Sequence, residues 1–268
     1  MERLIMLGTG NALVTRCYNT CFAIQDDDEY FLVDADGIMR QLQDADISMA
    51  QVHHIFLTHE HTDHLLGMIW MIRMIATKMR REQYEGNLRI YCHSALVETV
   101  RTIANLTLPK KFTRLLDHRI QFVPLHDGDT KHILDYDVTF FDILSTKAKQ
   151  YGFTMRLKNG QKLTCAGDEP LNENCFGYAE GSDWLMHEAF CLYSQRDQYD
   201  PYEKHHSTVR EACELAAYLN VPNLILYHTE DDNIERRKAL YTAEGRLYYK
   251  GNLYVPDDLE CIELDKEE

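Results

Sequence analysis

The chain has 268 residues, of which 45% are hydrophobic and 26% are charged, and its net charge is −15. This composition supports a sizeable folded core and excludes a low-complexity or disordered chain. Non-specific nucleic-acid binding depends on Lys and Arg, so the excess of 43 acidic over 28 basic residues argues against a nucleic-acid substrate.

The length and the lack of any linker-like segment predict one domain over residues 1–268. No uninterrupted apolar segment reaches the roughly 18 residues that a membrane span requires, and we expect no signal peptide. The eight cysteines are scattered without a Cys-x-x-Cys pair. They predict reduced core residues and a cytoplasmic location.

Strand-like and helix-like patterns alternate along the chain, which predicts an α/β fold. In chain order they are strands at 3–7, 21–25 and 30–34, a helix near 37–44, a strand at 54–58, a helix near 64–81, a strand at 88–92, helices near 94–104 and 109–116, strands at 120–124, 136–143, 152–157, 161–166 and 184–188, a helix near 207–219, a strand at 223–227, a helix near 232–242 and a strand at 252–255. Thr208 and Glu211 have the spacing of a helix capping box.

Residues 59–64 read His-Glu-His-Thr-Asp-His, at the point where a predicted buried strand gives way to a helix. Imidazole nitrogen and carboxylate oxygen are the ligands that Zn²⁺ and similar divalent ions prefer. The four side chains are too close in sequence to serve a single tetrahedral ion. His59 and His61 alternate on one side, whereas Asp63 and His64 fall on another, so the motif favours two neighbouring ions.

His-x-His-x-Asp-His after a strand resembles the metallo-β-lactamase superfamily of two-metal hydrolases, which implies a four-layer αββα sandwich. Near the N-terminus, Phe31-Leu32-Val33-Asp34 is similar to an opening strand of that fold. Cys165-Ala166-Gly167-Asp168 looks like the strand end whose aspartate bridges the metals, and Leu224–His228 looks like the strand that ends in a metal-binding histidine. The alternatives are a simple turn at Asp168 and a core histidine at His228.

The resemblance implies a ligand set and a cofactor. The first ion would take His59, His61, Asp168 and one further histidine, and the second would take Asp63, His64, Asp168 and His228. One or two divalent ions are therefore expected, with Zn²⁺ first and Mn²⁺ or Fe²⁺ as alternatives. Asp63 could in addition orient a bound hydroxide, which would make it catalytic.

The sequence departs from the family pattern at the further histidine. The segment 144–152 reads Leu-Ser-Thr-Lys-Ala-Lys-Gln-Tyr-Gly, and Thr146 occupies the ligand position. Three outcomes are open: a weak first ion completed by water, a single ion at the second site, or a substitute imidazole such as His126. Lys147 could alternatively place an ammonium group near a substrate phosphate.

Two more motifs resemble those of the tRNase Z-like phosphodiesterases, namely His187-Glu188-Ala189 and His206-Ser207-Thr208. In that pattern Glu188 orients His206, which donates a proton to the leaving oxygen, and a carboxylate partner would raise the basicity of the imidazole. His205 is adjacent and could take the same role. The intervening loop 192–204, with Arg196 and Tyr199, is either a lid or ordinary loop packing.

These observations predict a metal-dependent hydrolase that cleaves a small phosphodiester. The alternatives are a hydrolase of another ester-type bond, such as a thioester or a lactone, and a catalytically weakened metal- or ligand-binding protein. The segment between Thr146 and Asp168 is too short for a tRNA-binding arm, so we do not expect tRNA 3′ processing. The resemblance also suggests a homodimer, but the sequence identifies neither the substrate nor a substrate-binding residue.

Overall fold

The computed structural model describes residues 2–35 and 38–264. Two seven-stranded sheets pack face to face, with the strand orders β14-β1-β2-β3-β4-β5-β6 and β13-β12-β11-β10-β9-β8-β7. The strands of the first sheet are β1 (Glu2–Gly8), β2 (Cys21–Asp26), β3 (Glu29–Val33), β4 (Val52–Phe56), β5 (Leu88–His93), β6 (Ile120–Leu125) and β14 (Glu260–Glu263). Those of the second are β7 (Thr130–Ile133), β8 (Tyr136–Asp142), β9 (Tyr151–Arg156), β10 (Lys162–Cys165), β11 (Trp184–Glu188), β12 (Asn223–Tyr227) and β13 (Asn252–Tyr254).

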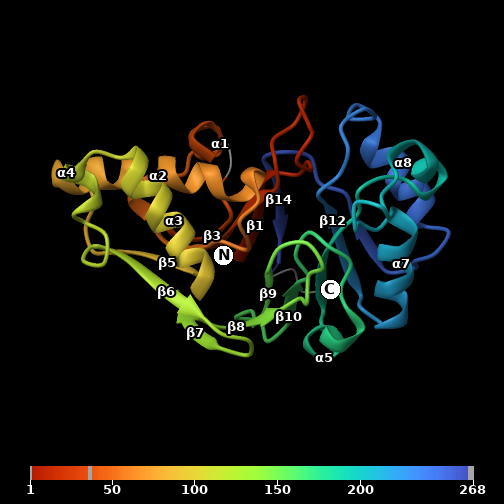
Figure 1. Cartoon of the computed structure of the whole chain (residues 1–268). Helices are drawn as coiled ribbons and strands as arrows, with labels where there is room; N and C mark the ends of the chain where they lie inside the picture. The colour runs from red at the N-terminus through yellow and green to blue at the C-terminus, as the bar shows by residue number, and fades with distance from the viewer. Residues whose placement is uncertain (1, 36–37, 265–268) are drawn as a thin grey trace.

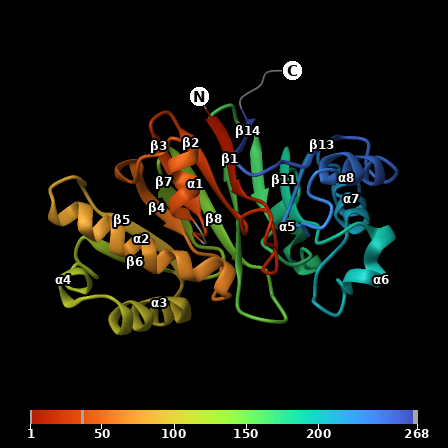
Figure 2. The ribbon, with the colours of Figure 1, turned by 90° about the horizontal axis from the view of Figure 1, so that it is seen from above.

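Helices cover the outer face of each sheet, so that the molecule has four layers (Figures 1 and 2). The helices on the first sheet are α1 (Ile38–Asp44), α2 (Thr62–Arg80), α3 (Ser94–Thr107) and α4 (Lys110–Thr113). Those on the second sheet's side are α5 (Phe176–Ala179), α6 (Arg196–Tyr199), α7 (Val209–Tyr218) and α8 (Arg237–Gly245). The predicted αββα metallo-β-lactamase sandwich is therefore confirmed.

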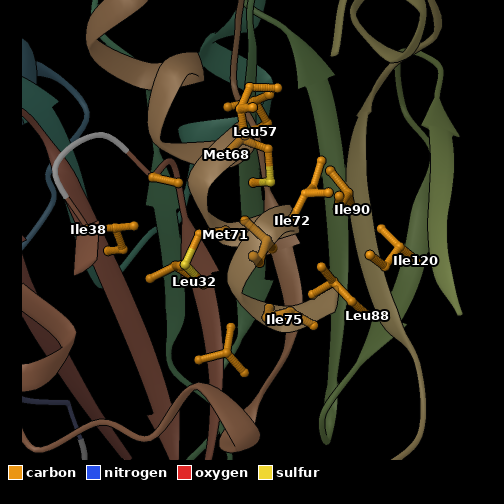
Figure 3. Packing of buried hydrophobic residues seen from close by; sticks show 14 of the residues in the cluster. Leu32, Ile38, Leu57, Met68, Met71, Ile72, Ile75, Leu88, Ile90 and Ile120 are labelled. Atoms are coloured by element: carbon orange, nitrogen blue, oxygen red, sulfur yellow. The ribbon is translucent and has the colours of Figure 1, made fainter. Parts of the chain in front are cut away.

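Three apolar cores hold the four layers together, and side chains alternate between them along each strand. In β2, Cys21 and Ala23 face the helices, whereas Phe22 and Ile24 enter the core between the sheets. Figure 3 shows Met68 and Ile72 of α2 against the first sheet. This burial on both faces explains why the central strands are almost continuously apolar.

Most predicted elements form with end shifts of one to three residues, and Thr208 and Glu211 make the predicted capping box. The helix predicted near 232–242 instead runs from Arg237 to Gly245, and the one near 109–116 shortens to Lys110–Thr113. Residue 37, the first residue of another predicted helix, lies outside the described residues. The strands β7 and β14 were not predicted, because each has only four residues and at least half of them are polar.

The topology places the carboxyl ends of several strands at one edge of the sandwich. Strands β3 to β6 are mutually parallel, and so are β10 to β13. Strand β8 is antiparallel to β9, which is antiparallel to β10, so the end of β8 lies at the same edge as the end of β10. The loops that follow these strands carry the candidate site.

Candidate metal centre and active site

The hexapeptide links β4 to α2, as its sequence predicts. His59 and His61 lie in the connecting loop, and Asp63 and His64 lie in the first turn of α2. His59, Asp63 and His64 are all buried. Because the loop is held between a central strand and a nineteen-residue helix, its side chains converge with little conformational freedom.

The second sheet contributes Asp168 and His228, which follow β10 and β12. Gly167, with φ +87°, makes the turn that carries Asp168 into the site. Asp168 Oδ2 lies 3.5 Å from His59 Nε2, 3.6 Å from His64 Nε2 and 3.7 Å from His228 Nε2. Three imidazoles from two sheets therefore point at a single carboxylate.

The predicted ligands form two groups whose donor atoms lie within 4.8 Å of one another in each group. One group is His59, His61 and Asp168, and the other is Asp63, His64 and His228. Asp168 Oδ1 is buried without a hydrogen-bond partner, as expected for an atom reserved for a cation, and His64 Nε2 lies 3.2 Å from Asp63 Oδ2 within its own group. Nitrogen and oxygen donors of this kind fit two divalent ions, with Asp168 between them.

The outer nitrogens of three of these imidazoles are held by side chains that the sequence analysis assigned no role. Asp34 Oδ2 accepts a hydrogen bond from His64 Nδ1 at 2.7 Å. Thr58 Oγ1 lies 2.9 Å from His59 Nδ1, and Thr20 Oγ1 lies 3.1 Å from His228 Nδ1. Each bond engages Nδ1, so that Nε2 points toward the other members of the site, which is how outer partners orient metal ligands.

The other hydrogen bonds of Thr58 and Thr20 fix the direction of the bonds between their hydroxyl groups and the imidazoles. Thr58 Oγ1 donates to Asp34, and Thr20 Oγ1 donates to the carbonyl of Gly10, so each hydroxyl accepts from its imidazole. The one sequence signal for these roles was the position of Asp34 directly after a buried strand. Nothing in the sequence distinguishes Thr20 or Thr58 from other buried threonines.

Electrostatics favours an ionised Asp168. Burial opposes ionisation, but the fields of His59, His228 and His64 outweigh it and hold the pKa of Asp168 well below its usual value. Burial also acts against a charged His64, yet Asp34 and Asp63 raise the pKa of that imidazole well above its usual value. The carboxylates thus give this cluster a strong affinity for positive charge.

Glu188 and His206 also come together. Glu188 ends β11, and its Oε2 lies 3.7 Å from His206 Nδ1, too long for a hydrogen bond. Both atoms are buried without a partner. Burial, followed by the charges of His228 and Lys147, lowers the pKa of His206 to about 3. The expected rise in basicity from Glu188 is therefore absent, because burial dominates and the pair is not bonded.

The two adjacent histidines face different surroundings. His206 lines the pocket that contains Asp168 and His228, and its ring stacks on Phe190 with centroids 4.8 Å apart. His205 Nδ1 instead lies 2.7 Å from Thr146 Oγ1 in a neighbouring depression, which His206 also lines, and His205 is not among the residues that line the metal pocket. Of the two candidates for the acid, His206 is the one that this geometry favours.

The position of the missing ligand is also informative. Thr146 lies in the depression with His205, whereas Lys147 lines the metal pocket. The substitute His126 is in a turn with its side chain 75% exposed, and it is absent from the lining of that pocket. The first ligand group therefore has three protein ligands among the described residues.

The pocket has a volume of about 520 Å³, within the range of small-ligand sites. Its walls combine the polar centre with apolar side chains and two lysines. The lining residues are Asn11, Ala12, Leu13, Glu60, His61, Thr62, Asp63, Lys147, Asp168, Phe190, Lys204, His206 and His228. Arg196 and Tyr199 are not among them: Tyr199 donates to Asp232 and Arg196 packs on Tyr193, which is ordinary loop packing.

Known proteins share this architecture. Ribonuclease Z of Thermococcus onnurineus is 28% identical, over 98% of this chain and 94% of the relative. The metallo-β-lactamase fold protein YhfI of Bacillus subtilis superposes with a TM-score of 0.81 at 15% identity, over 97% of this chain and 98% of that one. The short form of human tRNase Z superposes with a TM-score of 0.75 at 19% identity, over 98% of this chain and all of that one.

These comparisons confirm the predicted resemblance to tRNase Z-like proteins and agree with the prediction of a hydrolase whose fold implies divalent-metal binding. They leave the scissile bond and the identity of the metal open. A family model matches residues 2–251, which is nearly the whole of the sandwich. The chain thus belongs to the family described as Anti-Pycsar protein Apyc1.

Proposed function

We propose that this protein hydrolyses a small phosphodiester with the help of one or two divalent ions, with Zn²⁺ as the native metal. The observation that carries the proposal is the meeting of two ligand groups at Asp168, beside the buried pair of Glu188 and His206. The proposed ligands are His59, His61, Asp63, His64, Asp168 and His228. Divalent ions held by these residues would make water nucleophilic at neutral pH and would neutralise charge on a phosphoryl group.

The protein's own groups then have separate tasks. Asp63 lies in the first turn of α2 and lines the pocket, where its carboxylate can accept a hydrogen bond from the attacking water. His206 donates the proton on Nε2 to the oxygen of the leaving alkoxide. Glu188 acts through His206 as a positioning residue, because its Oε2 lies 3.7 Å from Nδ1 and both atoms are buried without a hydrogen-bond partner.

The 3.7 Å gap between Glu188 and His206 is compatible with this role. Two buried polar atoms without partners each carry a desolvation cost, and a small ring rotation that joins them would relieve both costs. Burial raises the pKa of Glu188 well above its usual value while it lowers that of His206, so a shared proton suits the pair. Catalytic hydrogen bonds often shorten only when substrate binds.

Three observations favour a small substrate over tRNA. Between Thr146 and Asp168 the chain forms only β9, a turn and β10, which leaves no residues for an arm. The alignment with the Thermococcus onnurineus Ribonuclease Z runs over 310 positions, so that relative has insertions that this 268-residue chain lacks. The net charge of −15 also opposes binding to a polyanion.

The first experiment is hydrolysis of bis(p-nitrophenyl) phosphate by metal-stripped protein reconstituted with Zn²⁺, Mn²⁺ or Fe²⁺. Turnover that depends on metal and is lost in His64→Ala supports the proposal. Bound metal without turnover by any ion would refute it, and parallel assays with a thioester and a lactone would then identify another ester-type bond. Failure of all three would indicate a ligand-binding protein.

The role of His206 is tested by leaving groups. His206→Ala should keep its metal and should slow an alkyl phosphodiester far more than a p-nitrophenyl ester, because p-nitrophenolate needs no proton to leave. Equal loss with both substrates would exclude His206 as the acid. His205→Ala is the matched control, since His205 faces Thr146 and not the metal pocket.

The location and the assembly stay predictions. Among the helices formed by residues 2–35 and 38–264, none has the length and apolar character needed to cross a bilayer. None of the eight cysteines, all of which lie in the described residues, forms a disulfide, which favours a reducing compartment such as the cytoplasm. A homodimer is tested by light scattering on the eluted protein.

A further inference from the structure

Lys147 lines the wall of the pocket. It directly follows Thr146, the position at which the family pattern places a histidine. Its side chain is 22% exposed, so most of the aliphatic stem is covered while the residue still lines the metal pocket. Its ammonium Nζ lies 3.4 Å from His206 Nε2, which is the atom that faces the proposed leaving group. A lysine ammonium group therefore lies beside the reacting end of the pocket.

The loop that carries Lys147 is held firmly against the metal centre. Leu144 adopts a positive φ of 59°, which turns the chain at the end of β8. Glu169, the neighbour of Asp168, accepts hydrogen bonds from the Ser145 hydroxyl at 2.6 Å and from the Thr146 backbone N–H at 3.3 Å. Lys147 is thus positioned by the residue next to the central carboxylate, as a binding residue should be.

The ammonium group has capacity left for a ligand. It has three N–H donors. Nζ lies 3.4 Å from His206 Nε2, which carries the proton in the proposed function and therefore does not accept another, and 3.7 Å from Glu169 Oε1, which is longer than a hydrogen bond. Glu169 Oε1 already accepts the shorter bond from Ser145, so its charge is shared. By contrast, the other lysine of the pocket, Lys204, donates to the Tyr199 carbonyl at 2.6 Å and lies over the Phe190 ring.

We propose that Lys147 binds an anionic phosphoryl oxygen of the substrate and thereby selects charged phosphate esters over neutral esters. The inference rests on the proposed function only for the identity of the ester. Its physical basis is that an acidic chain repels anions, so a phosphate must be met by local positive charge at the pocket. A lysine acts here as a point charge for phosphate, and it also lies close enough to His206 to keep the oxygen near the acid.

The experiment compares Lys147→Met with two other variants. Lys149→Met removes the same charge two residues along the loop, where the ammonium pairs with Asp142 outside the pocket lining. Lys147→Arg retains the charge. For each reconstituted protein, calorimetry measures the affinity for inorganic phosphate and mass spectrometry measures the metal content. Steady-state kinetics gives KM for bis(p-nitrophenyl) phosphate and for p-nitrophenyl acetate.

Loss of one charged hydrogen bond should weaken phosphate binding and raise KM for the phosphodiester by roughly 10- to 100-fold in Lys147→Met. Metal content, thermal midpoint and the response to the neutral acetate should not change. Lys147→Arg should recover most of the affinity, and Lys149→Met should change it by less than about threefold because a screened surface charge acts weakly.

The outcomes separate this inference from the proposed function. Turnover of the phosphodiester with wild-type phosphate affinity in Lys147→Met would overturn the role of Lys147 and leave phosphodiester hydrolysis standing. Phosphate binding that depends on Lys147 without any phosphodiester turnover would support the role of Lys147 and refute phosphodiester hydrolysis. Loss of a metal ion from Lys147→Met would also overturn the inference, since it would make the lysine part of the metal centre.

Discussion

Replacing Asp34 by asparagine tests how the second group of metal ligands is held. Asp34 is buried, follows β3 directly and has a positive φ of 58°. Asparagine tolerates this left-handed conformation as well as aspartate does, so the substitution alters the hydrogen bonds and not the backbone. The change replaces one carboxylate oxygen, which accepts hydrogen bonds, by an NH₂ group, which only donates them.

The carboxylate of Asp34 accepts from three donors. Thr58 N–H lies 2.9 Å from Oδ1, the Thr58 hydroxyl lies 2.9 Å from Oδ2, and His64 Nδ1 lies 2.7 Å from Oδ2. An asparagine offers one oxygen, so either His64 or Thr58 must face an N–H donor. One buried donor is then left unsatisfied, which costs about 1–3 kcal/mol of stability.

The effect on metal binding follows from the tautomer of His64. With its Nδ1 proton no longer accepted, His64 gains by moving the proton to Nε2, and Nε2 then cannot bind a metal. Loss of an outer partner typically weakens metal affinity 10- to 100-fold, or about 1.4–2.7 kcal/mol. We expect this loss at the ion held by Asp63, His64 and His228, with a smaller loss at the other ion through Thr58 and His59.

The assay is a Zn²⁺ titration of metal-stripped protein against a chromophoric chelator, with stoichiometry checked by mass spectrometry. Asp26→Asn is the matched control, because Asp26 is a buried carboxylate bonded to Lys158 at the opposite end of the β2–β3 hairpin. Wild-type affinity for both ions in Asp34→Asn would refute the argument that Asp34 sets the orientation of His64.

Three further predictions concern the same region. Asp168→Ala removes the carboxylate between the two ligand groups, so metal content should fall below one ion per chain and turnover should vanish; two retained ions would contradict this. Thr20→Val removes the acceptor for His228 Nδ1 and should weaken the second ion by about tenfold, whereas Thr20→Ser should restore it, in the same chelator titration. Burial lowers the pKa of His187 to about 4 from a usual value of 6.5, so the unfolded chain takes up the proton first as the pH falls. The contribution of His187 to the free energy of unfolding is complete above pH 6.5 and decreases by about 3 kcal/mol by pH 4. In urea unfolding, the difference in free energy of unfolding between wild type and His187→Gln should shrink as the pH falls over this range.

The parts of the site that are local in sequence were predicted, and the parts that depend on tertiary neighbours were not. The hexapeptide carries four candidate ligands within six residues, so its chemistry is visible without a fold. Asp168 and His228 were placed by resemblance to strand ends. By contrast, the pairing of Asp34 with His64 requires β3 and β4 to be neighbours in one sheet, which no local pattern reveals.

The same reasoning explains the errors in the fold. Strand β14 pairs with β1 at an edge of the first sheet, and β7 is one of the two edge strands of the second. Edge strands meet solvent on one side and carry polar residues such as Lys131, Glu260 and Glu263, so they lack the apolar alternation on which strand prediction depends. Central strands such as β12, whose five residues are all buried, were placed correctly at 223–227.

The joining of the two sheets at the metal centre has a consequence for stability. The first sheet supplies His59, His61, Asp63 and His64, whereas the second supplies Asp168 and His228. The buried Asp168 Oδ1 has no hydrogen-bond partner, and it carries a desolvation cost of about 1–3 kcal/mol that a bound cation would offset. Because that offset exists only when both sheets are in place, metal binding should be coupled to the packing of one sheet on the other. Removal of metal should therefore loosen the contact between the sheets before it unfolds either of them.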